Sequence, residues 1–122
     1  MSIPILKHGR TLIVSLQSEP TDAEFVQLQH ELAQRVTTTH AKGVLIDVTA
    51  LEVLDSFATR TLREIGQTVT LCGARAAIVG VQPEVAFAMA QLGLSLEGTL
   101  TALDLEDGLA LLHAAGRAAP VT

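Results

Sequence analysis

The sequence predicts a single α/β domain with a mixed, mostly parallel sheet of four to five strands and about four helices. Three observations support this fold class. Short apolar runs alternate with segments of helical periodicity, which is typical of parallel strands joined by helices. The chain has 122 residues, enough for one sizeable core but not for two. Only 2% of the residues are aromatic, so aliphatic side chains must fill that core.

The first segment predicts a hairpin at one edge of the sheet. Residues 3–6 and 11–16 have the composition of strands. The chain is expected to turn at His8-Gly9-Arg10, because glycine tolerates left-handed backbone angles. A hairpin joins antiparallel strands, so this edge should run against the parallel remainder of the sheet.

A helix is expected next, capped by Thr21 or Asp22 and ending in the β-branched residues 37–39. An acidic first turn suits the positive end of the helix dipole. Apolar residues at helical spacing predict the buried side of this helix: Phe25, Leu28, Leu32 and Val36.

The middle of the chain predicts a buried strand and a second helix. Residues 44–48 are apolar at odd and even positions, which indicates a strand covered on both faces. The helix is expected to begin after Asp55 and to run to about Leu71. Its expected inner positions are Phe57, Leu62, Ile65 and Val69.

The last third of the chain repeats the alternation of strand and helix. Residues 74–81 predict another buried strand. Pro83 fits the first turn of a helix over 84–92, and Gly93 is expected to end that helix.

The closing elements are a weak strand at 99–103 and a helix from 105 to about 115, capped by Asp104. We therefore expect one domain over residues 1–116, followed by a frayed tail at 117–122.

Charge and composition argue against several classes of function. The formal net charge is −5 and no basic cluster is present, which disfavours nucleic-acid binding. No apolar run is long enough for a spanning helix, so no membrane role is expected. Cys72 is the single cysteine, which fits a reducing cytoplasm, and it is expected to be a small buried hydrophobe. The mean hydropathy of +0.41 suggests that part of the surface is buried against another subunit, as in a homodimer.

No established catalytic or cofactor motif is found. The four histidines are scattered over different elements and are expected to be solvated, and no metal or cofactor site is predicted. Asp47, near the end of the predicted central strand, resembles the phosphoacceptor of a receiver domain. That enzyme-like alternative needs paired acidic residues after the first parallel strand and a lysine, but no such pair follows residues 14–16 and no lysine follows Lys42. The favoured interpretation is that Asp47 accepts hydrogen bonds from loop amides.

The segment Asp55-Ser56 is the strongest candidate site. It opens an amphipathic helix, so one of its two side chains is expected to accept from the orphan amides of the first turn. A phosphoryl group on Ser56 would lie at the positive end of the helix dipole. Capping and phosphorylation are compatible interpretations of the same residues.

Five stretches of the chain resemble the STAS family (sulphate transporter and anti-sigma-factor antagonist domains), and the stressosome branch within it. They are Ile3-Pro-Ile-Leu6, Gly43-Val-Leu-Ile-Asp47, Asp55-Ser-Phe57, Gly80-Val-Gln-Pro83 and Thr101-Ala-Leu-Asp-Leu-Glu106. In this family Asp-Ser at the loop-to-helix junction is the phosphorylation motif. The resemblance implies that Ser56 is the phosphorylated residue. It also implies that Asp55, Asp47, Phe57, Thr59 and Arg60 support the site, with Thr59 in a structural role.

The resemblance also implies a non-enzymatic function. Such domains co-assemble with larger RsbR-type paralogues into a very large cytoplasmic particle that sequesters an RsbT-type serine kinase. Phosphorylation releases the kinase, and a phosphatase resets the serine. Because the chain begins in its first strand, we expect a small subunit without a sensory domain. The alternative is a free anti-sigma-factor antagonist that binds an anti-sigma kinase and is regulated through the same serine.

Overall fold

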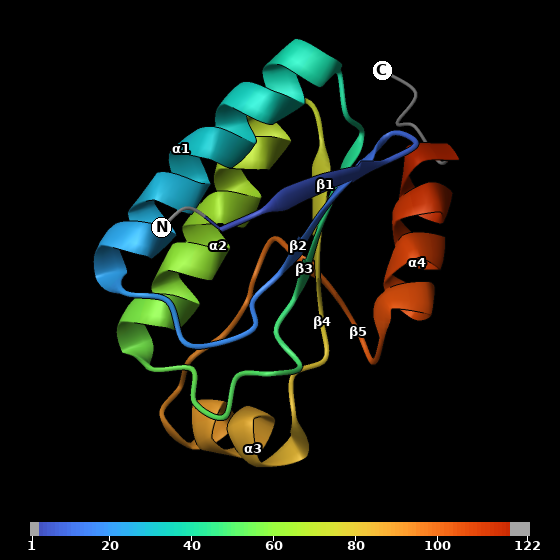
Figure 1. Cartoon of the computed structure of the whole chain (residues 1–122). Helices are drawn as coiled ribbons and strands as arrows, with labels where there is room; N and C mark the ends of the chain where they lie inside the picture. Colours follow the sequence, from blue (N-terminus) through green and yellow to red (C-terminus); the bar gives the residue numbers. More distant parts are fainter. Residues whose placement is uncertain (1–2, 118–122) are drawn as a thin grey trace.

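The computed structural model describes residues 3–117, which form a five-stranded sheet with four helices (Figure 1). The strands lie in sequence order across the sheet. β1 pairs antiparallel with β2, and every later neighbour pairs in parallel. The elements are β1 (Ile5–His8), β2 (Thr11–Ser15), α1 (Asp22–Thr39), β3 (Gly43–Asp47), α2 (Ser56–Leu71), β4 (Arg75–Val79), α3 (Pro83–Gln91), β5 (Leu100–Ala102) and α4 (Leu105–Arg117). The predicted fold class and element order are confirmed.

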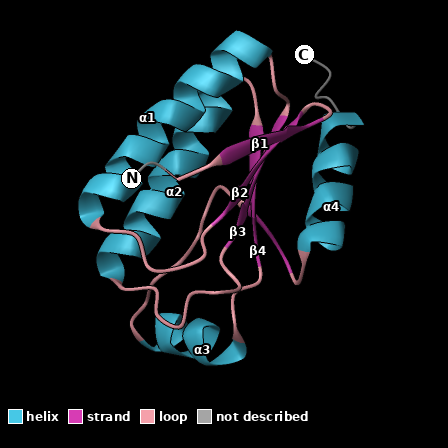
Figure 2. Ribbon diagram, viewed as in Figure 1, coloured by secondary structure: helices cyan, strands magenta, loops and turns pink. Residues whose placement is uncertain are grey.

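The helices divide the molecule into layers. Helices α1 and α2 lie side by side on one face of the sheet, and α4 covers the other (Figure 2). Helix α3 lies below the carboxyl ends of the parallel strands (Figure 1). Both α1 and α2 begin at that carboxyl edge, so their positive ends lie at the same side of the domain. None of the helices within residues 3–117 is long and apolar enough to cross a membrane.

The hairpin of β1 and β2 is tighter than the sequence indicates. The strands pair from Ile5 with Val14 to His8 with Thr11. The turn is therefore confined to Gly9 and Arg10, with Gly9 at a φ of +61°. The expected strand at residues 3–6 was set too early. His8 belongs to the strand because its backbone pairs with the partner strand.

The two faces of β3 and its neighbours bury different side chains, as a strand covered on both sides requires. Val44 and Ile46 face the larger part of the core, beneath α1 and α2. Leu45 packs instead against α4, together with Val79 and Leu112. All four apolar positions predicted for α1 are buried, as are Leu62, Ile65 and Val69 of α2: they are confirmed.

Three expectations differ from the structure or fall outside it. Phe57 is only half buried, because it lies in the first turn of α2 at the rim of the core. Cys72 is exposed, which contradicts the expected buried position. It follows the last buried residue of α2, Val69, and its backbone caps the helix end. Of the expected tail at 117–122, Arg117 closes α4 and residues 118–122 lie outside the described residues.

Thr21 is the cap of α1, which decides between the two expected candidates. The Thr21 hydroxyl accepts from the Glu24 amide at 3.1 Å, and the Glu24 carboxylate accepts from the Thr21 amide at 2.9 Å. These reciprocal bonds form a capping box. The hydrogen bonds from Thr21 lower the pKa of the Glu24 carboxyl group, since they stabilise its charged form.

We predict that Thr21→Ala lowers the free energy of unfolding by about 1 kcal/mol at neutral pH, because one amide of the first turn loses its partner. Urea unfolding of the variant and wild type measures the difference.

The contribution of Glu24 to the free energy of unfolding depends on pH. Its pKa is lower in the folded state, so it stabilises the fold above the ordinary carboxyl pKa of about 4.3. That contribution disappears as the pH falls through the lowered value. Glu24→Gln should remove this acid sensitivity, as measured by urea unfolding at neutral and acid pH. Equal acid sensitivity in wild type and variant would contradict the assignment.

Candidate functional site

The candidate site lies at the carboxyl edge of the sheet, where the loop after β3 leads into α2. Ser56 is the first residue of α2 and its side chain is exposed. The preceding loop, residues 48–55, contains three buried side chains, Val48, Leu51 and Leu54. The loop is therefore held against the core while its end presents Ser56 to solvent.

Asp47 fixes the first turn of this loop. One oxygen of its carboxylate accepts from the Thr49 amide at 2.9 Å and from the Thr49 hydroxyl at 2.6 Å. The Leu51 amide then donates to the Val48 carbonyl at 2.9 Å. The expected role of Asp47, accepting from a loop amide at the strand end, agrees with these contacts. Asp47 therefore affects the position of Ser56 indirectly, by ordering the loop that precedes it.

A second clamp on the loop comes from the segment between β4 and α3. The Gln82 side-chain amide donates to the Thr49 carbonyl at 2.7 Å. Gly80 has a φ of +83°, and a Cβ atom at this position would collide with the Thr49 side chain. The stretch Gly80-Val-Gln-Pro83 thus contributes a close backbone approach and a hydrogen bond to the loop that presents Ser56.

Asp55, not Ser56, caps α2. The Asp55 carboxylate accepts from the Ala58 amide at 2.7 Å, and its carbonyl accepts from the Thr59 amide at 2.9 Å. The Ser56 hydroxyl makes no side-chain hydrogen bond to another residue in the described part of the chain. Capping therefore leaves the serine hydroxyl free for chemistry.

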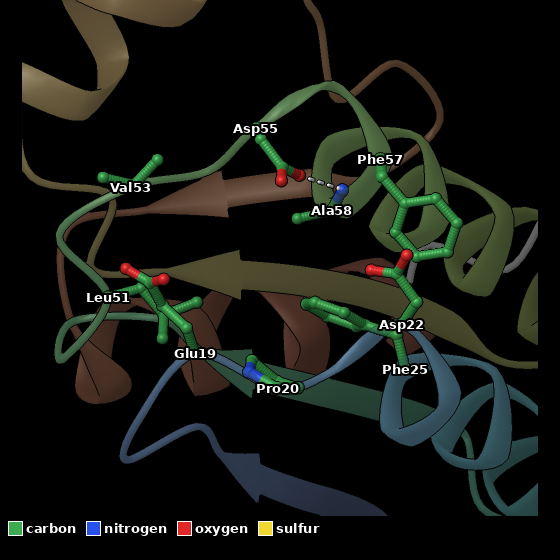
Figure 3. Close-up of a pocket in the computed structure, with 9 residues that line it drawn as sticks. All are labelled: Glu19, Pro20, Asp22, Phe25, Leu51, Val53, Asp55, Phe57 and Ala58. Carbon is green, nitrogen blue, oxygen red and sulfur yellow. Dashed lines mark hydrogen bonds between the residues drawn. The ribbon is translucent and has the colours of Figure 1, made fainter.

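A shallow groove of about 50 Å³ lies beside the start of α2 (Figure 3). The loop and first turn of α2 form one wall, and the segment that leads into α1 forms the other. The groove is too small for a drug-sized ligand, which needs about 300 Å³ or more. Its lining residues are Glu19, Pro20, Asp22, Phe25, Leu51, Val53, Asp55, Phe57 and Ala58.

The groove is acidic. Glu19, Asp22 and Asp55 contribute carboxylates, and no lining residue carries a basic side chain. In Figure 3 the Asp22 carboxylate points toward the Phe57 ring. Within residues 3–117, no group of three or more His, Cys, Asp or Glu side chains is placed to hold a metal ion.

The other expected site residues occupy distinct environments. Phe57 lines the groove next to Ser56. Thr59 is 1% exposed, and its hydroxyl has no hydrogen-bond partner among the described residues. Arg60 is exposed one helical turn after Ser56. The structure therefore brings Asp55, Phe57 and Arg60 to the surface around Ser56, while Thr59 lies inside.

Sequence reasoning missed the contribution of the α1 side of the site. Glu19 and Pro20 lie more than thirty residues before Ser56 and carry no local motif. Their place in the groove follows from the parallel sheet, which brings the starts of α1 and α2 to one edge. The acidic character of the segment 19–24 is the one signal that could have indicated it.

We predict that two neighbouring substitutions at this site change the free energy of unfolding by different amounts. Asp55→Ala should lower the free energy of unfolding by about 1 kcal/mol, because the Ala58 amide loses its acceptor. Ser56→Ala should change it by less than about 0.5 kcal/mol, as for an exposed surface residue. Chemical denaturation of the two variants measures both values. A larger loss in Ser56→Ala than in Asp55→Ala would show that the serine is the cap.

Comparison with known proteins agrees with this geometry. Residues 2–107 match the family model of the STAS domain. A curated relative, RsbT co-antagonist protein RsbRA of Bacillus subtilis (strain 168), is 28% identical over 83 residues, which make up 68% of this chain. The match covers 30% of that relative's length, so the chain corresponds to only part of it.

Two solved structures are similar over nearly the whole chain. A serine-to-glutamate variant of RsbS from Moorella thermoacetica is 38% identical, with a TM-score of 0.80, covering 94% of this chain and 97% of that one. A chain in a structure describing the molecular architecture of the stressosome is 39% identical, with a TM-score of 0.76, covering 93% and 99%. With the family model spanning residues 2–107, the chain belongs to the STAS domain family.

Proposed function

We propose that this chain is a non-enzymatic subunit of a stressosome-type assembly that holds an RsbT-type serine kinase and releases it when Ser56 is phosphorylated. The observation that carries the proposal is the exposed Ser56 hydroxyl, left free by the Asp55 cap at the start of α2. Support comes from the similarity to RsbS over nearly the full length of both chains. The relative RsbRA is named as a co-antagonist of RsbT.

The surroundings of Ser56 favour a switch that acts on a partner. A phosphoryl group adds about −1.5 to −2 charges at neutral pH. The groove beside it already carries three carboxylates and no basic side chain, so the added charge is not neutralised there. The dipole of α2 favours an anion at this end, which limits the cost to the fold. The main effect of phosphorylation therefore falls on whatever contacts this surface.

The surface around Ser56 offers apolar atoms for such a contact. Val53 is 57% exposed, and half-buried Phe57 lies at the opposite end of the same groove (Figure 3). We infer that a partner covering both would also dehydrate the Ser56 side chain, which is exposed and lies between them in the sequence. Dehydrating a phosphate beside carboxylates is costly, and a loss of about 1.5–3 kcal/mol weakens binding about 10- to 100-fold.

Arg60 lies outside the groove and is the first basic residue after Ser56 in α2. It is exposed and lies four residues later, so its side chain projects from the same face of α2. We assign it a supporting role at the phosphorylated site. Thr59 is buried and so does not pair with a phosphate on Ser56; the role proposed for it is structural.

The remaining partners follow from the same similarity. We propose that the chain forms a homodimer and co-assembles with RsbR-type STAS paralogues in the cytoplasm, and that a phosphatase restores Ser56. The exposed apolar side chains provide surface for such assembly; the largest exposures are those of Leu71, Leu103, Phe87 and Leu92.

The direct test is phosphorylation by the cognate RsbT-type kinase with ATP, followed by intact-mass and peptide mass spectrometry. We expect one phosphoryl group on wild type, none on Ser56→Ala and one on the matched control Thr59→Val. The signal should be stable in acid, unlike the acyl phosphate that a receiver-type Asp47 would form. Phosphorylation of another residue with Ser56 unmodified would contradict the proposal.

The assembly state separates this function from that of a free anti-sigma-factor antagonist. Co-expressed with an RsbR-type paralogue, the chain should elute in very large particles on size-exclusion chromatography with light scattering. Ser56→Ala should enter the same particles, because the hydroxyl makes no contact that holds the domain together. A chain that remains monomeric beside an assembled paralogue would favour the antagonist.

A further inference from the structure

We propose that a hollow at the amino edge of the sheet binds a small phosphate monoester that carries an apolar group. The hollow lies at the end of the domain opposite Ser56, between the β1–β2 hairpin, the start of β3 and α4. Figure 1 shows the hairpin turn beside the last turns of α4. The lining residues are His8, Arg10, Thr11, Lys42, Gly43, Leu109, Leu112 and His113.

The hollow has a charge opposite to that of the chain. It is lined by Arg10 and Lys42, and by His8 and His113, with no acidic residue. The whole chain has 13 acidic residues against 8 lysines and arginines. The sequence places the two histidines 105 residues apart, where they were expected to be scattered surface residues. They are exposed as expected, but the fold gathers them with two permanent cations around one cavity.

The shape suits a ligand with an apolar part. The hollow has a volume of about 550 Å³, within the range of about 300–1,000 Å³ that is typical of small-molecule sites. Its four basic side chains are exposed, whereas Gly43 and Leu112 are buried and Leu109 is half buried. A Cβ atom on Gly43 would lie 3.2 Å from a methyl carbon of Leu112. Glycine thus lets α4 approach β3 closely, and the leucines form an apolar wall below the cations.

Backbone hydrogen bonds hold the cationic segments together. The Arg10 carbonyl accepts from the Lys42 amide at 2.8 Å and from the Gly43 amide at 3.2 Å. The Lys42 carbonyl accepts in turn from the Arg75 amide at 3.0 Å. The Cα positions of Arg10 and Lys42 are therefore fixed before a ligand arrives, which reduces the entropic cost of binding.

Basic residues are common near the carboxyl end of a helix, where they offset its negative dipole, but this does not explain the positions of all four bases. His113 lies in the second half of α4, where a base offsets the negative end of a helix. Arg10 and His8 belong to the hairpin, which has no such dipole. Guanidinium and ammonium groups are the usual partners of phosphate oxygens, and the adjoining leucines select for an apolar substituent.

The test uses the full chain with three probes: phenyl phosphate, inorganic phosphate and phenol. We expect saturable binding of phenyl phosphate, weaker binding of inorganic phosphate and no saturable binding of phenol. Amide chemical shifts in NMR should change around residues 8–11, 42–43 and 109–113. The variants Arg10→Ala and Lys42→Ala should each weaken phenyl phosphate binding about tenfold, as expected for the loss of a charge-assisted hydrogen bond.

Lys7→Ala is the matched control. Lys7 is an exposed base next to His8, but alternation along β1 directs it to the opposite face of the sheet. The control should bind phenyl phosphate as wild type does, and so should Ser56→Ala. Equal weakening by Lys7→Ala, or no saturable binding of either phosphate, would overturn the proposal. Neither result bears on Ser56, which lies at the other edge.

Discussion

Parallel pairing of β2 to β5 is the constraint on which the rest of the structure depends. It makes each of these strands end at the same edge, so α1 and α2 both begin there. Asp22 in the first turn of α1 and Asp55 at the cap of α2 therefore both lie at this edge, where they line the groove beside Ser56. The hairpin turn and the start of β3 meet at the opposite edge, where Arg10 and Lys42 lie. One topological fact thus gives the domain an acidic site and a basic hollow at its two ends.

The presentation of Ser56 depends on three contacts around a single loop. Asp47 orders Thr49 from within the strand, and Gln82 holds the Thr49 carbonyl from the neighbouring segment. The Asp55 carboxylate then accepts from the Ala58 amide in the first turn of α2. Because the cap is supplied by Asp55, the serine can gain a phosphate without loss of a hydrogen bond that the fold needs. Under the proposed function, this separation of the capping residue from the phosphorylated residue would change the charge of the site while the domain stays folded.

The spacing of apolar residues along the chain was sufficient to predict most of the fold. Helical spacing identified the buried side of α1, and apolar residues of both parities identified β3 as covered on two faces. The sequence left Asp55 and Ser56 open as caps, because either type of side chain can accept at a helix start. It misplaced Cys72, since a short apolar neighbourhood does not show where the buried stripe of α2 ends. The pairing of Glu19 with Phe57 in one groove, and of His8 with His113 in one hollow, depends on tertiary contacts between distant segments.

The central claim is that a phosphate on Ser56 acts on a bound kinase rather than on the fold. Isothermal titration calorimetry of an RsbT-type kinase with unphosphorylated and stoichiometrically phosphorylated protein tests it most directly. The account predicts binding about 10- to 100-fold weaker after phosphorylation, with little change in the free energy of unfolding. Equal affinities for the two forms, or a phosphorylated protein that unfolds, would contradict it.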